Sequence, residues 1–445
     1  MAVPQTTELA GSGTRQAQPR SVRAWLVVTM VVALMVINFG DKAVLGLAAG
    51  PIMRELGLSA AEYGAVASSF YLLFSLSAVL VGFLSNRVKT TWILGVLAVL
   101  WSLTSVPLLL AASVSTLYLS RIALGAAEGP TAPMVVHAVQ KWFPEDRRSV
   151  PTALTQMGGA LGLVIASPTL VYLITNHGWR SAFVALALAG LVWVVLWAFI
   201  GREGPLTTYD AGQRGVVQAG GEPDVPYRKL FFNGTFLGGL LAGVGAYWAL
   251  AMNTAWLPMY LEKGLGYEAH QIGVVVVIPN VLNALAMLVV PWISGRWMRR
   301  GATGRTARGV VAGLAVAFAG GCMLLLPHTS GAAALVLMTL AFGLPSVAFP
   351  LGYLTAAQIA PVRKRGALMA SKTALVTLAG VFAPAVTGAL VQAAGSPGAG
   401  FQAAFGVCAG LMIVGGLLAV LVVNPERDAA RLGLLPPARP AADRS

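Results

Sequence analysis

Long apolar runs, each followed by a short polar or Gly/Pro-rich stretch, recur along the whole chain. A helix needs about 20 mostly apolar residues to cross the hydrocarbon core of a bilayer, and these runs reach that length. Lipid cannot satisfy free backbone N–H and C=O groups, and the runs are too long for barrel strands, so the pattern predicts helices. We expect twelve of them, at 24–48, 63–84, 91–112, 115–138, 150–174, 181–200, 235–260, 271–294, 307–326, 332–355, 366–392 and 401–423.

The composition agrees with this pattern. Hydrophobic residues make up 57% of the 445 residues, charged residues make up 10%, and the mean hydropathy is +0.76. Soluble domains contain roughly 25% charged residues. The sequence therefore predicts an all-α membrane protein without a large soluble domain. The first run is longer than a signal-peptide core and contains Asp41 and Lys42, so we expect it to remain as the first span after a polar tail, 1–23.

The longest polar stretch between two runs, 201–231, divides them into two groups of six. It is rich in Gly, Asp, Glu and Arg and predicts a flexible cytoplasmic linker. The segment GFLSNR at 82–87, after the second run, has a counterpart in PWISGR at 291–296, after the eighth. The sequence thus predicts two pseudo-symmetric six-helix halves, 24–200 and 232–424, an arrangement typical of carriers that work by alternating access.

Lys and Arg are distributed unequally between the loops of the two sides. Twenty-four lie on the side of the N-terminus, those of the C-terminal tail 425–445 included, whereas only Arg54, Arg180 and Lys263 lie on the other side. Because cytoplasmic loops carry the positive excess, we expect both termini in the cytoplasm and the chain in the inner (plasma) membrane. The net charge of +14 then reflects topology and gives no reason to expect a nucleic-acid partner.

Only two of the sixteen acidic residues, Asp41 and Glu128, lie well inside the apolar runs. A charge at bilayer depth costs about 2.5–3.5 kcal/mol, so such residues usually face the bundle interior and mark ion or substrate paths. Arg121 precedes Glu128 by two helical turns and shares its face. These three residues are candidates for proton coupling. The alternative is a structural ion pair, for which Arg121 is the natural partner.

Two lysines also lie inside the runs. Lys42 follows Asp41 directly and points to a different side of the helix, where it either recognises a carboxylate or balances charge within the membrane. Lys372 lies roughly 9 Å from the cytoplasmic start of its helix, so its stem can extend to the lipid headgroups. The alternative for Lys372 is a role as an anion ligand.

Uncharged polar side chains within the runs are further candidates for substrate contacts, although such side chains more often form hydrogen bonds between helices. The candidates selected are Gln156, Tyr247, Asn253 and Thr377, and Asn38 and Tyr71 are additional possible lining residues.

The pattern of reactive residues does not predict an enzyme. The two cysteines and four histidines show no spacing typical of a metal site or a nucleophile pair, and no Gly-rich phosphate loop is present. We therefore expect neither a catalytic cluster nor a metal or other cofactor. An ion gradient or the substrate gradient itself must then drive transport.

Several motifs together resemble the anion:cation symporter family within the major facilitator superfamily. They are INFGDK at 37–42 followed by RELGLS at 54–59, GFLSNR at 82–87, RIALGAAEGP at 121–130, GWRSAF at 178–183 and WLPMYL at 256–261. The resemblance implies that Asp41 and Glu128 couple transport to protons with support from Arg121. It also implies organic-anion substrates, such as sugar acids and aromatic carboxylates.

The chain departs from this family at four positions. Lys42 stands where the family usually has Arg, Thr377 where it commonly has Asn, and Asn86 and Gly295 replace the Asp of two equivalent loops. In the family those Asp residues help to lock the cytoplasmic gate through charge pairs with neighbouring Arg. The resemblance therefore makes Asn86, Arg87 and Arg296 candidate gating residues and implies a looser outward-facing state.

Taken together, these features predict a monomeric secondary transporter that takes up a small organic anion with protons. A proton-antiport exporter of drugs or metabolites is one alternative, because exporters also use acidic residues in the membrane. A transporter-like membrane sensor is another, since it would bind a ligand without moving it.

Overall fold

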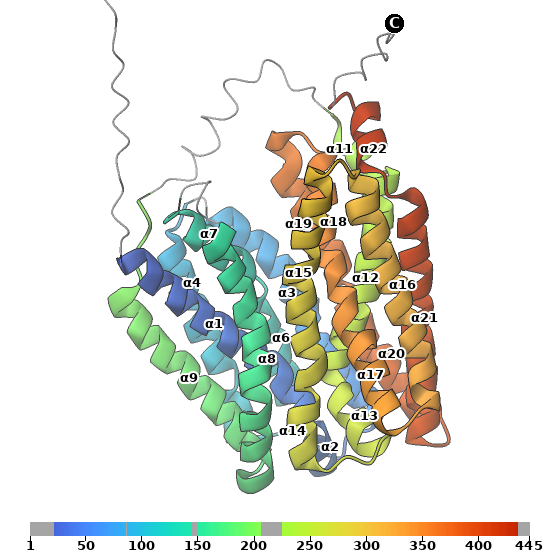
Figure 1. Ribbon diagram of the computed structural model, residues 1–445. Coiled ribbons are helices and arrows are strands. Elements are labelled where there is room, and N and C mark those ends of the chain that lie inside the picture. Colours follow the sequence, from blue (N-terminus) through green and yellow to red (C-terminus); the bar gives the residue numbers. More distant parts are fainter. Residues whose placement is uncertain (1–21, 86, 144–148, 206–224, 435–445) are drawn as a thin grey trace, which may run out of the picture.

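The computed structural model describes residues 22–85, 87–143, 149–205 and 225–434. These ranges are helical and contain no strand, which confirms the predicted all-α fold (Figure 1). The N-terminal half comprises α1 (Val22–Leu47), α2 (Ala49–Leu56), α3 (Ala60–Leu84), α4 (Thr90–Thr104), α5 (Val106–Leu110), α6 (Val114–Glu128), α7 (Thr131–Gln140), α8 (Ser149–His177) and α9 (Trp179–Ile200). The C-terminal half comprises α12 (Gly234–Ala255), α13 (Leu257–Lys263), α14 (Ala269–Val275), α15 (Val277–Arg299), the π-helical η1 (Arg305–Val310), α16 (Val311–Leu325), the 3₁₀ turn η2 (Leu326–His328), α17 (Gly331–Gly343), the 3₁₀ turn η3 (Leu344–Val347), α18 (Ala348–Gln358), α19 (Val362–Thr377), α20 (Ala379–Ala393) and α21 (Pro397–Val422).

Twelve helical segments correspond to the twelve predicted runs. In the described part of the chain, eleven are long and apolar enough to cross a membrane as single spans. The twelfth consists of α6 and α7, which are separated by Gly129 and Pro130. Pro130 has no N–H to donate to the preceding turn, so the hydrogen-bond ladder is interrupted there. The run expected at 235–260 is also divided, because α12 ends at Ala255 and α13 follows.

The ends of the bundle are marked by short helices. Figure 1 shows α11 (Tyr227–Phe231) and α22 (Pro425–Arg431) at one end, and α2, α13 and α14 at the other. We refer to the first end as the terminal face and to the second as the opposite face.

Related carboxylates cap a helix in each half at the terminal face. Glu203, which follows α9, accepts hydrogen bonds from the backbone N–H of Thr90 (3.3 Å) and of Thr91 (3.1 Å) at the start of α4. Glu426 lies at the start of α22, which follows α21. Its carboxylate accepts hydrogen bonds from the backbone N–H of Gly304 and, at 3.2 Å, from that of Arg305 at the start of η1. Each carboxylate follows the last long helix of its half, so the caps reflect the pseudo-symmetry of the two halves.

Glu203 also pairs with Lys141, just after α7, and accepts from the Thr91 hydroxyl at 2.9 Å. Burial raises the pKa of Glu203, but the hydrogen bonds from Lys141 and Thr91 outweigh this effect and bring the pKa below its ordinary value. The stabilisation is therefore present above the unfolded-state pKa and is lost as the pH falls through the lower folded-state pKa.

We expect Glu203→Gln to destabilise the N-terminal half by roughly 1.5–3 kcal/mol, the usual contribution of a hydrogen bond to a charged group. The variant leaves Lys141 without its carboxylate partner. Thermal unfolding of the purified protein at neutral pH measures the effect, and Arg300→Gln, at an exposed residue of the same face, is the control. Equal unfolding temperatures for the two variants would contradict the prediction.

The two halves approach each other most closely through glycines near the opposite face. A Cβ atom on Gly46 of α1 would lie 2.0 Å from the carbonyl oxygen of Thr254, and one on Gly64 of α3 would lie 2.5 Å from that of Pro384. On α20, a Cβ on Gly388 would lie 2.3 Å from the carbonyl oxygen of Ala60. Only glycine permits these backbone approaches, so the contact surface depends on its missing side chain.

Hydrogen bonds join the halves along the same surface. The buried Tyr63 hydroxyl shares its hydrogen between the carbonyls of Leu45 (2.9 Å) and Ala255 (3.2 Å). The backbone N–H of Ala385 donates to the Ser68 hydroxyl at 3.0 Å. Among the described residues, no hydrogen bond or ion pair joins the halves closer to the terminal face than the contact of Ser75 with Thr377 (2.6 Å). The structure is thus the conformer in which the opposite face is closed.

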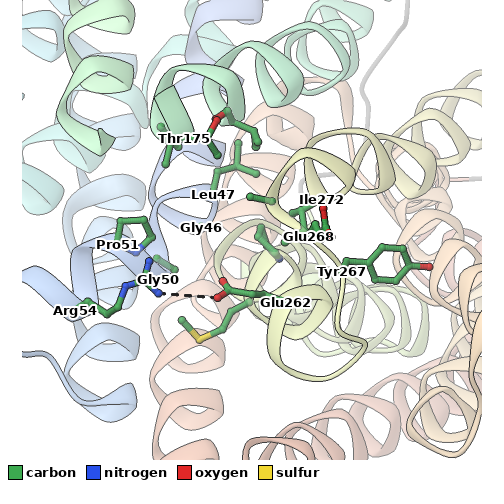
Figure 2. Close-up of a pocket in the computed structure, with 16 residues that line it drawn as sticks. Gly46, Leu47, Gly50, Pro51, Arg54, Thr175, Glu262, Tyr267, Glu268 and Ile272 are labelled. Atoms are coloured by element: carbon green, nitrogen blue, oxygen red, sulfur yellow. Dashed lines mark hydrogen bonds and ion pairs between the residues drawn. The ribbon is translucent and has the colours of Figure 1, made fainter. Parts of the chain in front are cut away.

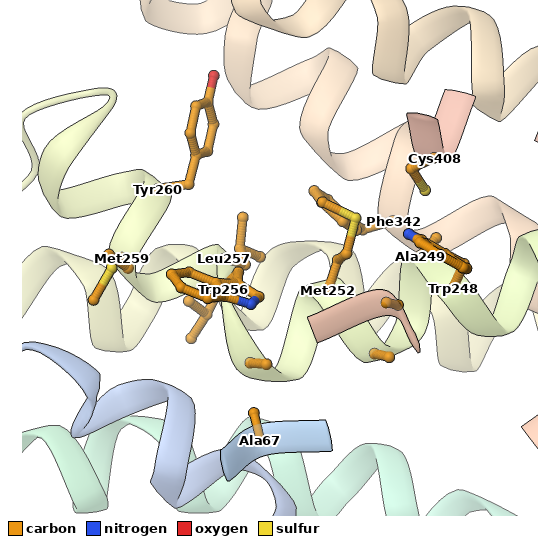
Figure 3. Packing of buried hydrophobic residues seen from close by; sticks show 14 of the residues in the cluster. Ala67, Trp248, Ala249, Met252, Trp256, Leu257, Met259, Tyr260, Phe342 and Cys408 are labelled. Carbon is orange, nitrogen blue, oxygen red and sulfur yellow. The ribbon is translucent and has the colours of Figure 1, made fainter. Parts of the chain in front are cut away.

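The Trp256 ring reinforces this closure. Figure 3 shows Trp248, Met252 and Trp256, spaced four residues apart, within one buried cluster that also contains Ala67 of α3. This spacing places Trp248 and Met252 on one side of α12, and Trp256 continues that side just after the helix ends. The Trp256 ring meets that of Tyr63 edge to face at 5.1 Å and donates to the Pro384 carbonyl at 3.1 Å.

We expect Tyr63→Phe to weaken the closed conformer, because it removes the hydroxyl that bridges α1 and α12. One neutral hydrogen bond contributes about 0.5–1.5 kcal/mol, which shifts the balance between conformers roughly 2- to 10-fold. Labelling of Thr254→Cys by an impermeant maleimide from the opposite face should become faster in a background without the native cysteines. Tyr118→Phe, a half-buried tyrosine of α6, is the control, and unchanged labelling in Tyr63→Phe would contradict the prediction.

Candidate functional site

Four charged residues from two helices meet inside the N-terminal half. α1 carries Asp41 and Lys42, and α6 carries Arg121 and Glu128. Asp41, Arg121 and Glu128 are 5%, 3% and 1% exposed, respectively, so this charge cluster lies in the protein interior. Lys42 is half-buried. Charges at this depth are costly unless they compensate one another or bind a ligand.

The position of Glu128 depends on close packing between α6 and α3. A Cβ atom on Gly125 would lie 1.7 Å from the carbonyl oxygen of Phe70, and one on Gly129 would lie 2.0 Å from that of Phe74. Gly125 precedes Glu128 by three residues, and Gly129 follows it directly. The sequence between Gly125 and Pro130 therefore brings the helix backbones together and keeps the carboxylate away from lipid.

Lys42 is the cation nearest to Glu128, with Nζ 3.6 Å from Oε2. Its ammonium also donates to Asn38 Oδ1 at 2.6 Å and lies 4.5 Å from the centre of the Phe39 ring and 5.6 Å from that of Phe74. Aromatic faces attract ammonium groups at such distances. Lys42 thus has a carboxylate, an amide and two aromatic rings as neighbours, and its side chain keeps 18% of its surface exposed.

The alternative interpretation is a structural ion pair in which Arg121 is the partner. An ion pair is present, but the partner of Glu128 is Lys42 and not Arg121. Arg121 forms no ion pair within the part of the chain that the structure describes, although it interacts electrostatically with Glu128 and Asp41. Lys42 occupies that position because its long stem reaches from α1 to Glu128. Adjacency in sequence places Lys42 and Asp41 on different sides of α1, but it does not reveal which side faces α6.

Several polar atoms of the cluster have no hydrogen-bond partner. At close range these are Oδ2 of Asp41, Nε of Arg121 and both carboxylate oxygens of Glu128. The Lys42 ammonium, 3.6 Å from Glu128 Oε2, and the Asn38 side chain interact with that carboxylate at slightly longer range. Each buried unsatisfied group costs about 1–3 kcal/mol, and more when it is charged. Protonation of a carboxylate, or an added ligand, would reduce this cost. The cluster therefore has the chemistry of a site that exchanges protons or binds an ion.

Three aromatic rings, contributed by both halves, lie next to the charge cluster. Tyr247 of α12 meets Tyr71 of α3 edge to face at 5.9 Å and Phe349 of α18 at 6.2 Å. Tyr71 interacts electrostatically with Glu128 and Arg121. Tyr247, a predicted contact, is therefore brought to the same region as the cluster.

Asn253 and Thr377 form hydrogen bonds between helices. The buried Asn253 amide donates to Asn280 Oδ1 at 3.0 Å, and the Thr377 hydroxyl contacts Ser75 at 2.6 Å. The hydrogen bond of Asn253 therefore lies within the C-terminal half, whereas the contact of Thr377 joins the two halves. Both observations fit the alternative that the sequence left open for such side chains.

Lys372 is buried, with 4% of its surface exposed, so the expectation that it extends to the headgroups is wrong. Its ammonium lies between α12 and α18 and donates to the carbonyl oxygen of Gly352 at 2.9 Å. The stem is long enough to reach the surface, but the neighbouring helices enclose it.

The remaining predicted residues lie apart from the cluster or outside the described structure. Asn86 is not among the described residues, and neither is the side chain of Gln156. Arg87 and Arg296 are exposed, and within the described ranges neither forms an ion pair. The Arg296 guanidinium lies over the Trp292 ring at 5.2 Å.

Sequence reasoning missed Phe39, Phe74 and Ser75, which contact Lys42 or Thr377. A signal was available for two of them. Phe74 and Ser75 follow Tyr71 by three and four residues, so the three share one face of α3. Because Tyr71 is a candidate lining residue, its face of α3 indicates Phe74 and Ser75 as further candidates.

A separate cavity of about 530 Å³ lies between the halves at the opposite face. Figure 2 shows Gly46, Leu47 and Gly50 on one side of it and Glu262, Glu268 and Ile272 on the other. Arg54 and Glu262 form an exposed ion pair across it at 4.0 Å, a contact of small energetic value on its own. No residue of the charge cluster lines this cavity, which belongs to the closed contact surface.

Comparison with solved structures supports the same architecture. The chain resembles a bacterial homologue of the human lysosomal transporter Spinster in an inward-facing, unoccupied conformation, with a TM-score of 0.76 at 17% identity over 94% of this chain and 100% of that one. It also resembles a D-xylose–proton symporter, with a TM-score of 0.73 at 16% identity over 91% and 99% of the two chains. At such identities the likeness concerns the fold alone.

Curated relatives cover nearly the whole chain. A hexuronate transporter of Bacillus subtilis is 28% identical over 88% of this chain and 92% of its own length. A probable sulfoacetate transporter of Cupriavidus necator is 26% identical over 90% and 94%. The D-galactonate transporter of Escherichia coli is 25% identical over 92% and 97%.

The family assignment rests on the whole sequence as well as on the fold. The family model described as Major Facilitator Superfamily matches residues 31–349 and 304–440, so it spans both halves. This confirms the family expected from the motifs, and it makes the protein a secondary transporter with two six-helix halves and not an enzyme. The chain therefore belongs to the Major Facilitator Superfamily.

Proposed function

We propose that this transporter takes up a small organic anion, such as a sugar acid, together with protons. The observation that carries the proposal is the buried charge cluster, in which both carboxylate oxygens of Glu128 and one of Asp41 lack a close hydrogen-bond partner. The relatives named for hexuronate, galactonate and sulfoacetate support an acidic substrate. Lys42 is then the substrate's cationic partner, and Asp41 and Glu128 carry the protons.

The coupling follows from competition for Lys42. In the ionised state, Glu128 attracts the Lys42 ammonium at 3.6 Å. Protonation of Glu128 removes that attraction and makes the ammonium available to a substrate carboxylate. After substrate release, loss of the proton restores the pair and resets the site. Arg121 supports the cycle through its electrostatic interaction with both carboxylates.

The orientation follows from the excess of Lys and Arg in the loops of the terminal face. We place that face in the cytoplasm and the multi-pass chain in the plasma membrane, with both termini inside. The closed opposite face then lies outside, so the structure is an inward-facing conformer. Residues 24–200 and 232–424 form the two halves that rock against each other, and we take the monomer as the working unit.

Proteoliposome flux tests the function. Purified protein should accumulate labelled galactonate or glucuronate when an inward proton gradient is applied, and a protonophore should abolish the accumulation. Uptake of a monoanion with two protons would also respond to membrane potential, by about 2.3 kcal/mol per 100 mV. Proton release driven by a drug, without any acid uptake, would replace this function by export. Acid binding without flux would indicate a sensor.

A further inference from the structure

Lys372 is an unexplained charge in the C-terminal half. In the described structure it is the only charged side chain of that half that is buried within a membrane-spanning segment. Its one hydrogen-bond partner is the carbonyl oxygen of Gly352, so two of the three ammonium donors remain unused. No carboxylate of the described chain pairs with it. A buried cation without a counter-ion is costly unless its partner arrives from elsewhere.

The space around Lys372 is shaped for an ammonium group. A Cβ atom on Gly239 of α12 would lie 2.7 Å from Nζ, and one on Gly352 of α18 would lie 2.8 Å from it. Any larger residue at either position would crowd the charged end of the side chain. The two glycines thus keep a narrow slot open, and the flexible lysine stem can leave it by rotation.

Lys372 and Lys42 lie at different levels of the bundle. On α3, Phe74 lies beside Lys42 and the next residue, Ser75, contacts Thr377 of α19. Lys372 precedes Thr377 by five residues, which is about 7.5 Å along the helix axis toward the terminal face. The backbone of Lys372 therefore lies closer to the terminal face than the Ser75–Thr377 contact, and its ammonium must leave the slot between α12 and α18 to reach a substrate held by Lys42.

We propose that Lys372 is a second anion-binding group and that the preferred substrates carry two anionic groups. Lys42 of the N-terminal half binds one of them, and Lys372 leaves the Gly352 carbonyl to bind the other. This inference rests on the proposed function and specifies its substrate class as dianions, such as six-carbon dicarboxylates. A ligand held from both halves would also favour the conformers in which the halves are close.

Charge balance is consistent with such a substrate. When Asp41 and Glu128 are ionised, they compensate Lys42 and Arg121, and only the charge of Lys372 remains. Protonation of both carboxylates adds two positive charges, which a dianion neutralises. A dianion that crosses with two protons moves no net charge, whereas a monoanion with two protons moves one.

The test compares galactarate, which has two carboxylates, with galactonate, which has one, as substrates of proteoliposomes. Wild-type protein should show the lower KM for galactarate. Lys372→Met should raise the KM for galactarate roughly 10- to 150-fold, as expected for the loss of a charged hydrogen bond, and change that for galactonate far less. Lys372→Arg should recover part of the galactarate affinity, because it restores the charge.

Gly239→Ala is a second variant. It keeps Lys372 but places a methyl group close to the Lys372 ammonium. It should change the KM for galactarate and not that for galactonate, so the inference stays testable if Lys372→Met fails to fold. Equal KM changes for both acids, no change, or a loss of maximal rate alone would overturn the role of Lys372. Uptake of galactonate without galactarate would overturn only this inference, whereas uptake of neither acid by the wild type would overturn the proposed function.

Discussion

Glu128→Gln is expected to remove the contribution of one proton to substrate accumulation while exchange of substrate between the two sides continues. Glutamine keeps the size and polarity of the side chain but cannot gain or lose a proton at neutral pH. A pH difference of one unit supports about tenfold accumulation for each coupled proton, since one pH unit corresponds to about 1.4 kcal/mol. Asp41 keeps its own proton in the variant, so the ratio of internal to external substrate should fall by about tenfold for each pH unit of the gradient.

Two flux assays on the same liposomes distinguish this effect from simple inactivation. Accumulation under an inward proton gradient should fall, whereas counterflow of labelled against unlabelled substrate should persist. Glu62→Gln is the matched control, because it makes the same chemical change in the exposed capping box of α3, where glutamine serves as well as glutamate. Accumulation by Glu128→Gln at the wild-type ratio would show that Glu128 does not carry the coupled proton.

Gly46→Ala is expected to hold the transporter open at the opposite face. The added Cβ atom would lie 2.0 Å from the carbonyl oxygen of Thr254, a backbone atom that cannot rotate away. Overpacking of this kind costs about 1–3 kcal/mol, roughly a 5- to 150-fold shift away from the closed conformer. Because every turnover must pass through that conformer, both uptake and counterflow should fall.

Gly321→Ala in α16 is the control, since no atom lies within 4 Å of the added Cβ there. A reporter at Thr254→Cys, in a background without the native cysteines, should react faster from the opposite face in Gly46→Ala than in Gly321→Ala. Normal transport by Gly46→Ala would mean that α1 and α12 can move apart at this point without weakening the closed conformer. The close approach would then have no role in gating.

The sequence by itself was enough to predict the twelve spans. Their length, their apolar composition and the cost of unsatisfied backbone groups in lipid leave no alternative to helices. The same cost identified Asp41, Arg121 and Glu128, because charged residues stand out in a chain that otherwise excludes them from lipid. The divisions within several runs were not expected, such as that of the fourth at Gly129 and Pro130, that of the seventh after Ala255 and that of the tenth at η3.

Tertiary structure decided which charges meet. The period of a helix gives the relative directions of Lys42 and Asp41, but the rotation of α1 against α6 determines that Lys42 and not Arg121 pairs with Glu128. The burial of Lys372 has the same origin. Its stem is long enough to reach water, and only the packing of α12 and α18 around Gly239 and Gly352 encloses it. Local patterns report which residues are costly in lipid, whereas partners and burial depend on contacts between segments far apart in the chain.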